Sequence, residues 1–244
     1  MPMANAWGWP TLFLKIAVFF AGAAWLTLNR LDNRGWDYPL IRLKYGALLA
    51  IVPLVAAEAV VQLQYFLNLN PNVITSCCGS LFSADSAGVA AEVAGVAPRD
   101  AAAALGGSGL LVLGAGAWLY RRGTAGAAFA AAAAFAFVVA VVALVSLIAL
   151  YVYEHPHHHC PFCLLKAGHD HVGYWLYLPL FAGTAFALGA AVVAPWRRVP
   201  SLALVAPAET RRLTLLALGG FTAFYAVACW AILRSSLTMS GVWW

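Results

Sequence analysis

The sequence predicts an all-α integral membrane protein, a bundle of six transmembrane helices with two polar extracytoplasmic loops. Of its 244 residues, 64% are hydrophobic and 9% are charged, whereas a soluble domain usually carries about 25% charged residues. Ionised groups are costly in lipid, so a surface that faces a bilayer explains this deficit. The chain also divides into long apolar runs separated by short polar links, and each run has the length of one membrane-spanning helix.

Six apolar runs each supply roughly 20 residues, enough for a helix to cross the hydrocarbon core. The predicted spans cover about 9–28, 46–67, 101–120, 125–153, 174–194 and 213–233. Lys15 lies in the first turns of the first span, where we expect its side chain to snorkel to the interface. The ten residues that precede the first apolar stretch contain no Lys or Arg, so we treat that stretch as a span and not as a cleavable signal. We expect residues 1–244 to form a single membrane domain.

Basic residues indicate the orientation of the spans. The links after spans 1, 3 and 5 are rich in Arg and Lys, whereas loops 68–100 and 154–173 carry only Arg99 and Lys166. Because cytoplasmic loops retain positive charge, both of these loops and both termini are predicted to be extracytoplasmic, on the periplasmic side of a bacterial-type inner membrane. The net charge of +5 is spread between apolar runs, a pattern of topology signals that argues against nucleic-acid binding.

The second polar loop is rich in histidine and cysteine. All six histidines of the protein lie between His155 and His171, interleaved with the motif Cys160-Pro161-Phe162-Cys163. Imidazole and thiolate together suit Cu(I) and Zn(II), and cysteines three residues apart can point at one centre. The sequence therefore predicts a metal site for copper, with zinc as the alternative, and Asp170 as an acceptor that orients a ligating imidazole. The candidate ligands are His155, His157, His158, His159, Cys160, Cys163, His169, His171, Cys77 and Cys78.

The same cysteines also form a candidate redox centre. The first thiol of a C-x-x-C motif often has a lowered pKa and attacks disulfides as a thiolate. The vicinal pair Cys77 and Cys78 lies in the other polar loop, and its Cα atoms, about 3.8 Å apart across a trans peptide, are too close for an ordinary disulfide. This pair is better suited to binding a soft ion or to exchanging with Cys160 and Cys163. In that case the four cysteines are catalytic, and the protein needs no cofactor beside its redox-active disulfide.

Two known groups share these cysteine arrangements. The two outer pairs resemble those of membrane thiol oxidoreductases of the DsbB and vitamin K epoxide reductase type, and the vicinal pair resembles that of mercury transport membrane proteins. The first resemblance implies disulfide exchange at the outer face of a helix bundle, and the second implies soft-metal handling. The predicted helix count and the histidine block depart from both groups.

Polar residues within the second span form another candidate. Glu58 lies near the middle of this span and Gln62 lies one turn further along the same face. A carboxylate inside a membrane is a functional candidate, and the alternative is a hydrogen bond between helices. Cys229, a lone cysteine among apolar residues of the last span, is expected to be a packing residue.

Three functions follow from these patterns, and enzymatic activity remains open. The first is a membrane protein that captures, delivers or transports a metal ion, copper favoured, with a periplasmic metal chaperone or metalloenzyme as partner. The second is a membrane thiol–disulfide oxidoreductase that exchanges electrons with a thioredoxin-like protein or quinone. The third is a non-catalytic accessory subunit of a membrane complex.

Overall fold

The computed structural model describes residues 5–69 and 89–238, and it confirms the prediction of six helices long and apolar enough to cross a membrane. The long helices are α1 (Gly8–Asp32), α2 (Ile41–Leu67), α4 (Pro98–Arg122), α5 (Gly126–Ala143), α7 (Val172–Val193) and α8 (Val205–Arg234). Helix α5 continues through a π-helical turn (Leu144–Ile148) into α6 (Ala149–Tyr153), and the three segments make one span. The short helix α3 (Val89–Ala94) precedes α4, and 3₁₀ turns cover Cys163–Leu165, Ala167–His169, Ala194–Arg198 and Pro200–Leu202.

Helices α1, α2, α4 and α8 extend beyond the predicted apolar runs. Helix α8 begins at Val205, two turns before the apolar run, and α2 begins at Ile41. Hydropathy locates the lipid-facing part of a helix, whereas backbone hydrogen bonding continues into the polar boundary of the bilayer. Local signals fix the ends of α4: Pro98 occupies its first turn, and Gly123 ends it in a left-handed conformation with φ of 66°.

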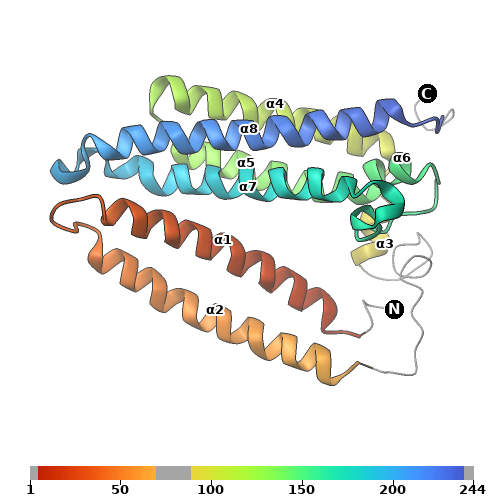
Figure 1. Ribbon diagram of the computed structural model, residues 1–244, viewed down its shortest axis with the longest axis horizontal. Helices are drawn as coiled ribbons and strands as arrows, with labels where there is room; N and C mark the ends of the chain where they lie inside the picture. Colours follow the sequence, from red (N-terminus) through yellow and green to blue (C-terminus); the bar gives the residue numbers. More distant parts are fainter. Residues whose placement is uncertain (1–4, 70–88, 239–244) are drawn as a thin grey trace.

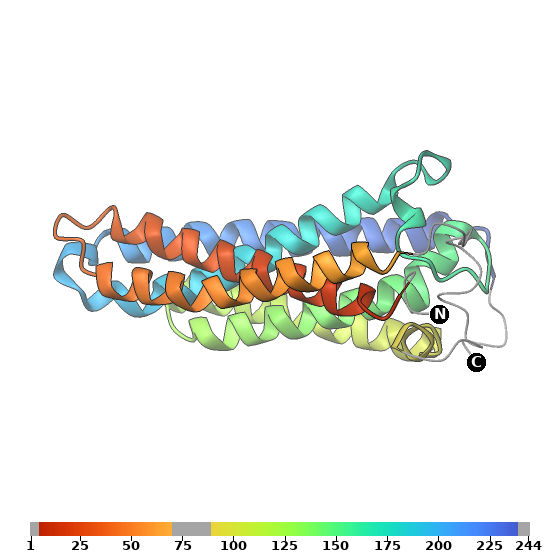
Figure 2. The same cartoon turned by 90° about the horizontal axis from the view of Figure 1, so that it is seen from below.

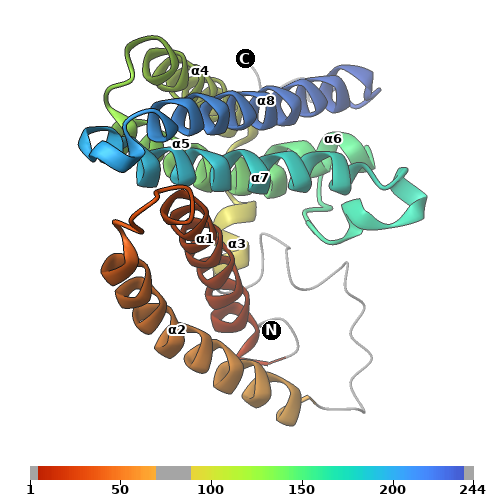
Figure 3. The ribbon, with the colours of Figure 1, turned by 60° about the vertical axis from the view of Figure 1, so that its left-hand side comes forward.

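Helices α4, α5, α7 and α8 pack as a four-helix bundle in which α5 is the most enclosed (Figure 1). Helix α1 packs against α7, and α2 lies on the far side of α1 from the bundle (Figure 3). The α1–α2 hairpin is therefore peripheral, and α2 presents most of its apolar surface outward.

The two ends of the bundle differ in chemistry. At one end, here called the histidine end, lie α3, α6, the loop 154–171 and both described chain ends (Figures 1 and 2). At the other, the arginine end, lie the α1–α2 turn and the link from α7 to α8.

A buried ion pair closes the α1–α2 turn at the arginine end. Asp32, fully buried at the end of α1, accepts a hydrogen bond from the backbone N–H of Leu40 at 2.7 Å through Oδ1. Its Oδ2 lies 2.7 Å from the Nζ atom of Lys44 in α2. The carbonyl of Lys44 in turn accepts a hydrogen bond from the Trp25 indole at 2.9 Å. Both charges are thus paired, as burial requires.

Glycine allows α7 and α8 to approach closely. A Cβ atom added at Gly220 would lie 2.8 Å from the Cα atom of Gly183 and 2.8 Å from the carbonyl oxygen of Pro179. A Cβ atom added at the adjacent Gly219 would meet nothing within 4 Å. Small residues at such crossings let membrane helices pack backbone to backbone.

We expect Gly220→Ala to lower the stability of the bundle by about 1–3 kcal/mol, because the added methyl group has no free space. The measurement is the apparent Tm of the purified protein in detergent. The matched control is Gly219→Ala, which should unfold at or above the wild-type temperature since Ala is the better helix former. Equal apparent Tm values for the two variants would contradict the close approach of α7 and α8.

Candidate functional site

The histidine loop leaves α6 at Glu154, whose backbone adopts a left-handed conformation with φ of 51°. Its carboxylate accepts hydrogen bonds from Ser236, at 2.9 Å from the backbone N–H and 2.8 Å from the hydroxyl. These hydrogen bonds hold the pKa of Glu154 below its usual value. The end of α8 is thereby joined to the start of the loop.

His159 anchors the middle of the loop on the bundle. Its side chain is buried, and its Nδ1 lies 3.0 Å from the carbonyl oxygen of Val145 in the π-helical turn. A carbonyl oxygen accepts hydrogen bonds and does not donate them, so Nδ1 carries the proton and Nε2 of the neutral ring holds a lone pair. Burial lowers the pKa of His159, and the Val145 hydrogen bond opposes this shift in part.

His158 and His169 lie against the ring of Tyr153. Their ring centroids are 4.1 Å and 4.5 Å from that of Tyr153. Nε2 of His158 is buried and has no hydrogen-bond partner among the residues that the structure describes. Burial, followed by the nearby His169, lowers the pKa of His158, so this ring is neutral near pH 7.

The remaining histidines lie at the surface. His155 and His157 have ring centroids 6.0 Å apart and are exposed. His171 is also exposed, and its Nδ1 lies 2.8 Å from the carbonyl oxygen of Leu165. The six histidines thus point in several directions. Within the ranges 5–69 and 89–238, no three His, Cys, Asp or Glu side chains are grouped closely enough to hold one metal ion.

The cysteines of the C-x-x-C motif lie together in the interior. Cys160 is 1% exposed and Cys163 is 2% exposed. They pack in an apolar pocket, here called the cysteine pocket, whose other residues come from α1, α3, the π-helical turn and α6: Trp9, Val93, Ala94, Val145 and Tyr153. The carbonyl of Val145 also binds His159, so the buried histidine and the cysteine pocket share a contact with the π-helical turn that follows α5.

Two tyrosine hydroxyls hold the backbone of the motif. The Tyr153 hydroxyl donates to the carbonyl of Cys160 at 2.6 Å, and the Tyr177 hydroxyl donates to that of Pro161 at 2.8 Å. A 3₁₀ turn then begins at Cys163. Sequence reasoning assigned neither tyrosine to the site, because the two lie in different helices and nothing local pairs them with the motif.

Cys77 and Cys78 lie outside the described residues. The described residues on either side, Leu69 after α2 and Val89 at the start of α3, belong to segments at the histidine end (Figure 1). Helix α3 itself contributes Val93 and Ala94 to the cysteine pocket. The approach of the vicinal pair to Cys160 and Cys163 stays a prediction.

The intramembrane polar residues form a bridge between α1 and α2. Nζ of Lys15 lies 2.6 Å from Oε1 of Glu58 and 2.6 Å from Oε1 of Gln62. Lys15, which was expected to snorkel, is therefore held by polar partners in the neighbouring helix. The sequence signal was the similar depth of Lys15 and Glu58 in consecutive, antiparallel spans. Cys229 lies apart from the cysteine pocket and is exposed on α8, so the expectation that it packs in the interior is wrong.

A cleft of about 400 Å³ lies on the histidine end between the loop, α6, α7 and α8. Tyr153 lines both this cleft and the cysteine pocket. At its rim, Arg234 lies 3.5 Å from Asp170 and covers the ring of Trp230 at 5.0 Å. The Asp170 carboxylate thus contacts Arg234, and its orientation of a ligating imidazole stays a prediction.

The sequence matches no known protein family, no curated protein and no solved structure.

The histidine loop should loosen as the pH falls. The pKa values of His158 and His159 are lowered in the folded protein, so stability is complete above the unfolded value of about 6.5 and is lost as the pH drops through the lower folded values. We expect the apparent Tm of wild-type protein to fall between about pH 8 and pH 5.5, and that of His159→Asn, which cannot titrate, to fall less.

His171→Asn is the control for this measurement, because His171 is exposed and is not among the groups that lower the pKa of His158 or His159. It should keep the wild-type pH dependence. If the apparent Tm of His159→Asn depended on pH as steeply as that of the wild type, the buried ring of His159 would not contribute to the pH dependence.

Proposed function

We propose that Cys160 and Cys163 form the reactive centre of a membrane thiol–disulfide oxidoreductase. The observation that carries this proposal is that both cysteines of the C-x-x-C motif lie in the same pocket, between α1, α3 and the π-helical turn. Burial in this pocket protects the pair from random oxidation but also leaves it inert, so a reaction requires the pocket to open. The backbone of the motif is held in place by two tyrosines.

The chemistry is a thiol–disulfide exchange. A thiolate of the pair attacks a partner disulfide, forms a mixed disulfide and releases one partner thiolate. The second cysteine then attacks the mixed disulfide, which closes the Cys160–Cys163 bond and releases the second partner thiolate. Two electrons pass from the pair to the partner, and the two protons of the thiols go to the partner sulfurs. The reverse sequence reduces the pair.

The exchange partner is proposed to be a thioredoxin-like protein, or the vicinal pair Cys77 and Cys78, whose mutual disulfide would be strained and therefore easily reduced. The segment that carries the vicinal pair ends at α3, and α3 lines the cysteine pocket. Both thiols are buried, so exchange with either partner needs the segments around them to move. We propose that the histidine end faces the extracytoplasmic side. The links rich in Arg and Lys lie at the opposite end, and positive charge of this kind favours the cytoplasmic side.

A soft-metal site, with copper favoured over zinc, is the second candidate. His159 supports it, because an imidazole whose Nδ1–H is fixed by a carbonyl presents Nε2 as a base, which is the usual state of a metal ligand. The buried Nε2 of His158 supports it as well. Cys160 and Cys163 are the soft ligands that would complete such a site. Because no three of these side chains are grouped in the described residues, the histidine loop would have to rearrange around the ion, and delivery to a metalloenzyme or chaperone is the corresponding activity.

A redox titration tests the first proposal. Full-length protein in detergent is equilibrated in glutathione or dithiothreitol buffers, quenched with acid and alkylated, and the cysteines are mapped by mass spectrometry. We expect Cys160 and Cys163 to convert together in a two-electron transition with a potential of roughly −120 to −270 mV, the range of thiol–disulfide oxidoreductases. Cys160→Ser and Cys163→Ser should each abolish it, and Cys229→Ser should leave it unchanged.

Metal analysis of the same anaerobic preparations separates the two candidates. Stoichiometric copper or zinc that is lost in Cys160→Ser and Cys163→Ser but kept in Cys229→Ser would favour the metal site. The redox proposal fails if both thiols stay reduced across the whole range of buffers.

A further inference from the structure

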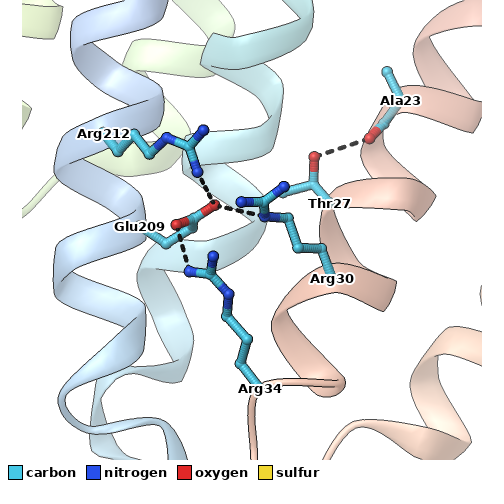
Figure 4. Close-up of polar contacts among 6 residues, drawn as sticks. All are labelled: Ala23, Thr27, Arg30, Arg34, Glu209 and Arg212. Carbon is cyan, nitrogen blue, oxygen red and sulfur yellow. Dashed lines mark hydrogen bonds and ion pairs between the residues drawn. The ribbon is translucent and has the colours of Figure 1, made fainter.

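An arginine cluster surrounds one buried carboxylate at the arginine end of the bundle. Glu209, near the start of α8, is 5% exposed. Its Oε2 lies 2.8 Å from Nη1 of Arg34, and its Oε1 lies 3.1 Å from Nε of Arg30 and 3.6 Å from Nη1 of Arg212 (Figure 4). The cluster joins the end of α1 to the start of α8, and we call it the arginine cluster.

The cluster has more positive charge than Glu209 neutralises. Three guanidinium groups face one carboxylate, which leaves two positive charges in surplus. Each guanidinium carries five N–H donors and contacts Glu209 through a single nitrogen. The three arginine side chains are between 41% and 55% exposed. Glu209 thus gathers the guanidinium groups side by side while most of their donors stay available to an anion.

The depth of the cluster selects the kind of anion. Arg30 follows the apolar part of α1, and Arg212 immediately precedes the apolar run of α8 that begins at Leu213. Both therefore lie where the hydrocarbon core gives way to the headgroup layer. A phosphate group of a lipid occupies the same layer.

Exposed leucines continue from the arginines toward the centre of the bilayer. Leu26 lies one turn deeper than Arg30 on the same face of α1 and is 61% exposed. Leu216 lies one turn deeper than Arg212 on α8 and is 41% exposed. Arg30 and Arg212 thus each have an exposed apolar side chain one turn deeper in the membrane, where the acyl chain of a bound lipid would lie.

We propose that the arginine cluster binds the phosphate of an anionic phospholipid between α1 and α8. The guanidinium groups donate charge-assisted hydrogen bonds to the phosphate oxygens, and the leucines contact the acyl chains. Because α1 belongs to the peripheral hairpin and α8 to the bundle, the lipid would also join these two parts of the protein.

The probe is phosphatidylglycerol, added to the full-length protein in a nonionic detergent, with phosphatidylcholine for comparison. The measurement is the increase in apparent Tm as lipid is titrated. We expect phosphatidylglycerol, and not phosphatidylcholine, to stabilise the wild-type protein. In Arg30→Gln/Arg212→Gln, half-saturation should need about 100-fold more lipid, because two charge-assisted contacts are lost and each is worth about tenfold.

The matched control is Arg198→Gln/Arg211→Gln. Both residues are exposed at the same end, and this variant removes the same charge without touching Glu209. It should keep the wild-type lipid response. If it loses the response to the same extent, the effect is general surface charge and the proposal is wrong.

A free anion is distinguished by inorganic phosphate. If phosphate alone raises the apparent Tm as much as the lipid does, the cluster is a site for soluble phosphate and the lipid proposal is overturned. Arg30→Gln/Arg212→Gln could lower the starting stability, because the cluster ties α1 to α8. The lipid-induced increment is therefore the quantity compared, and the single variant Arg212→Gln replaces the double variant if the latter does not fold.

Discussion

The geometry of the histidine end depends on one hydrogen bond, from Nδ1 of His159 to the carbonyl of Val145. The π-helical turn widens the end of α5, and such turns are often found at functional sites. By donating to this carbonyl, His159 draws a polar, proline-containing loop down onto an apolar helix. Cys160 follows directly in the chain and is therefore carried into the interior beside the same turn. The position of the thiols is a consequence of this anchor together with Tyr153 and Tyr177.

The opposite end is organised by charge. Two buried carboxylates are paired with basic side chains at this end: Asp32 with Lys44, and Glu209 with three arginines. The hydropathy pattern identifies the segments that carry most of these residues only as polar links. The first pair closes the α1–α2 turn, and the second attaches that hairpin to α8. Ion pairs thus attach the peripheral hairpin to the bundle at the arginine end. At the histidine end, Trp9 of α1 packs in the cysteine pocket. A shift of the hairpin would change the lining of that pocket.

The fold could be predicted from the sequence because its main driving force, the burial of apolar runs in lipid, is local along the chain. The six spans could be located without knowing which helices contact one another. The candidate site could be predicted less well, because its contacts are not local along the chain. The six histidines are close together in the sequence, but the backbone of the loop directs their side chains to different places. His159 points into the bundle, and His158 and His169 pack against Tyr153. His155 and His157 stay at the surface. Lys15 and Glu58 pair across two helices, which a residue-by-residue interpretation of each span does not reveal.

The bridge between Lys15, Glu58 and Gln62 bears on how the protein reaches its membrane. A charged side chain near the centre of an inserting helix costs about 2.5–3.5 kcal/mol when it enters lipid alone. Since the two charges neutralise each other across the hairpin, α1 and α2 gain most by leaving the translocation channel as a preassembled pair. Biogenesis of the N-terminal third would then wait until synthesis of α2 is complete, and the four-helix bundle would assemble against a hairpin that is already in place.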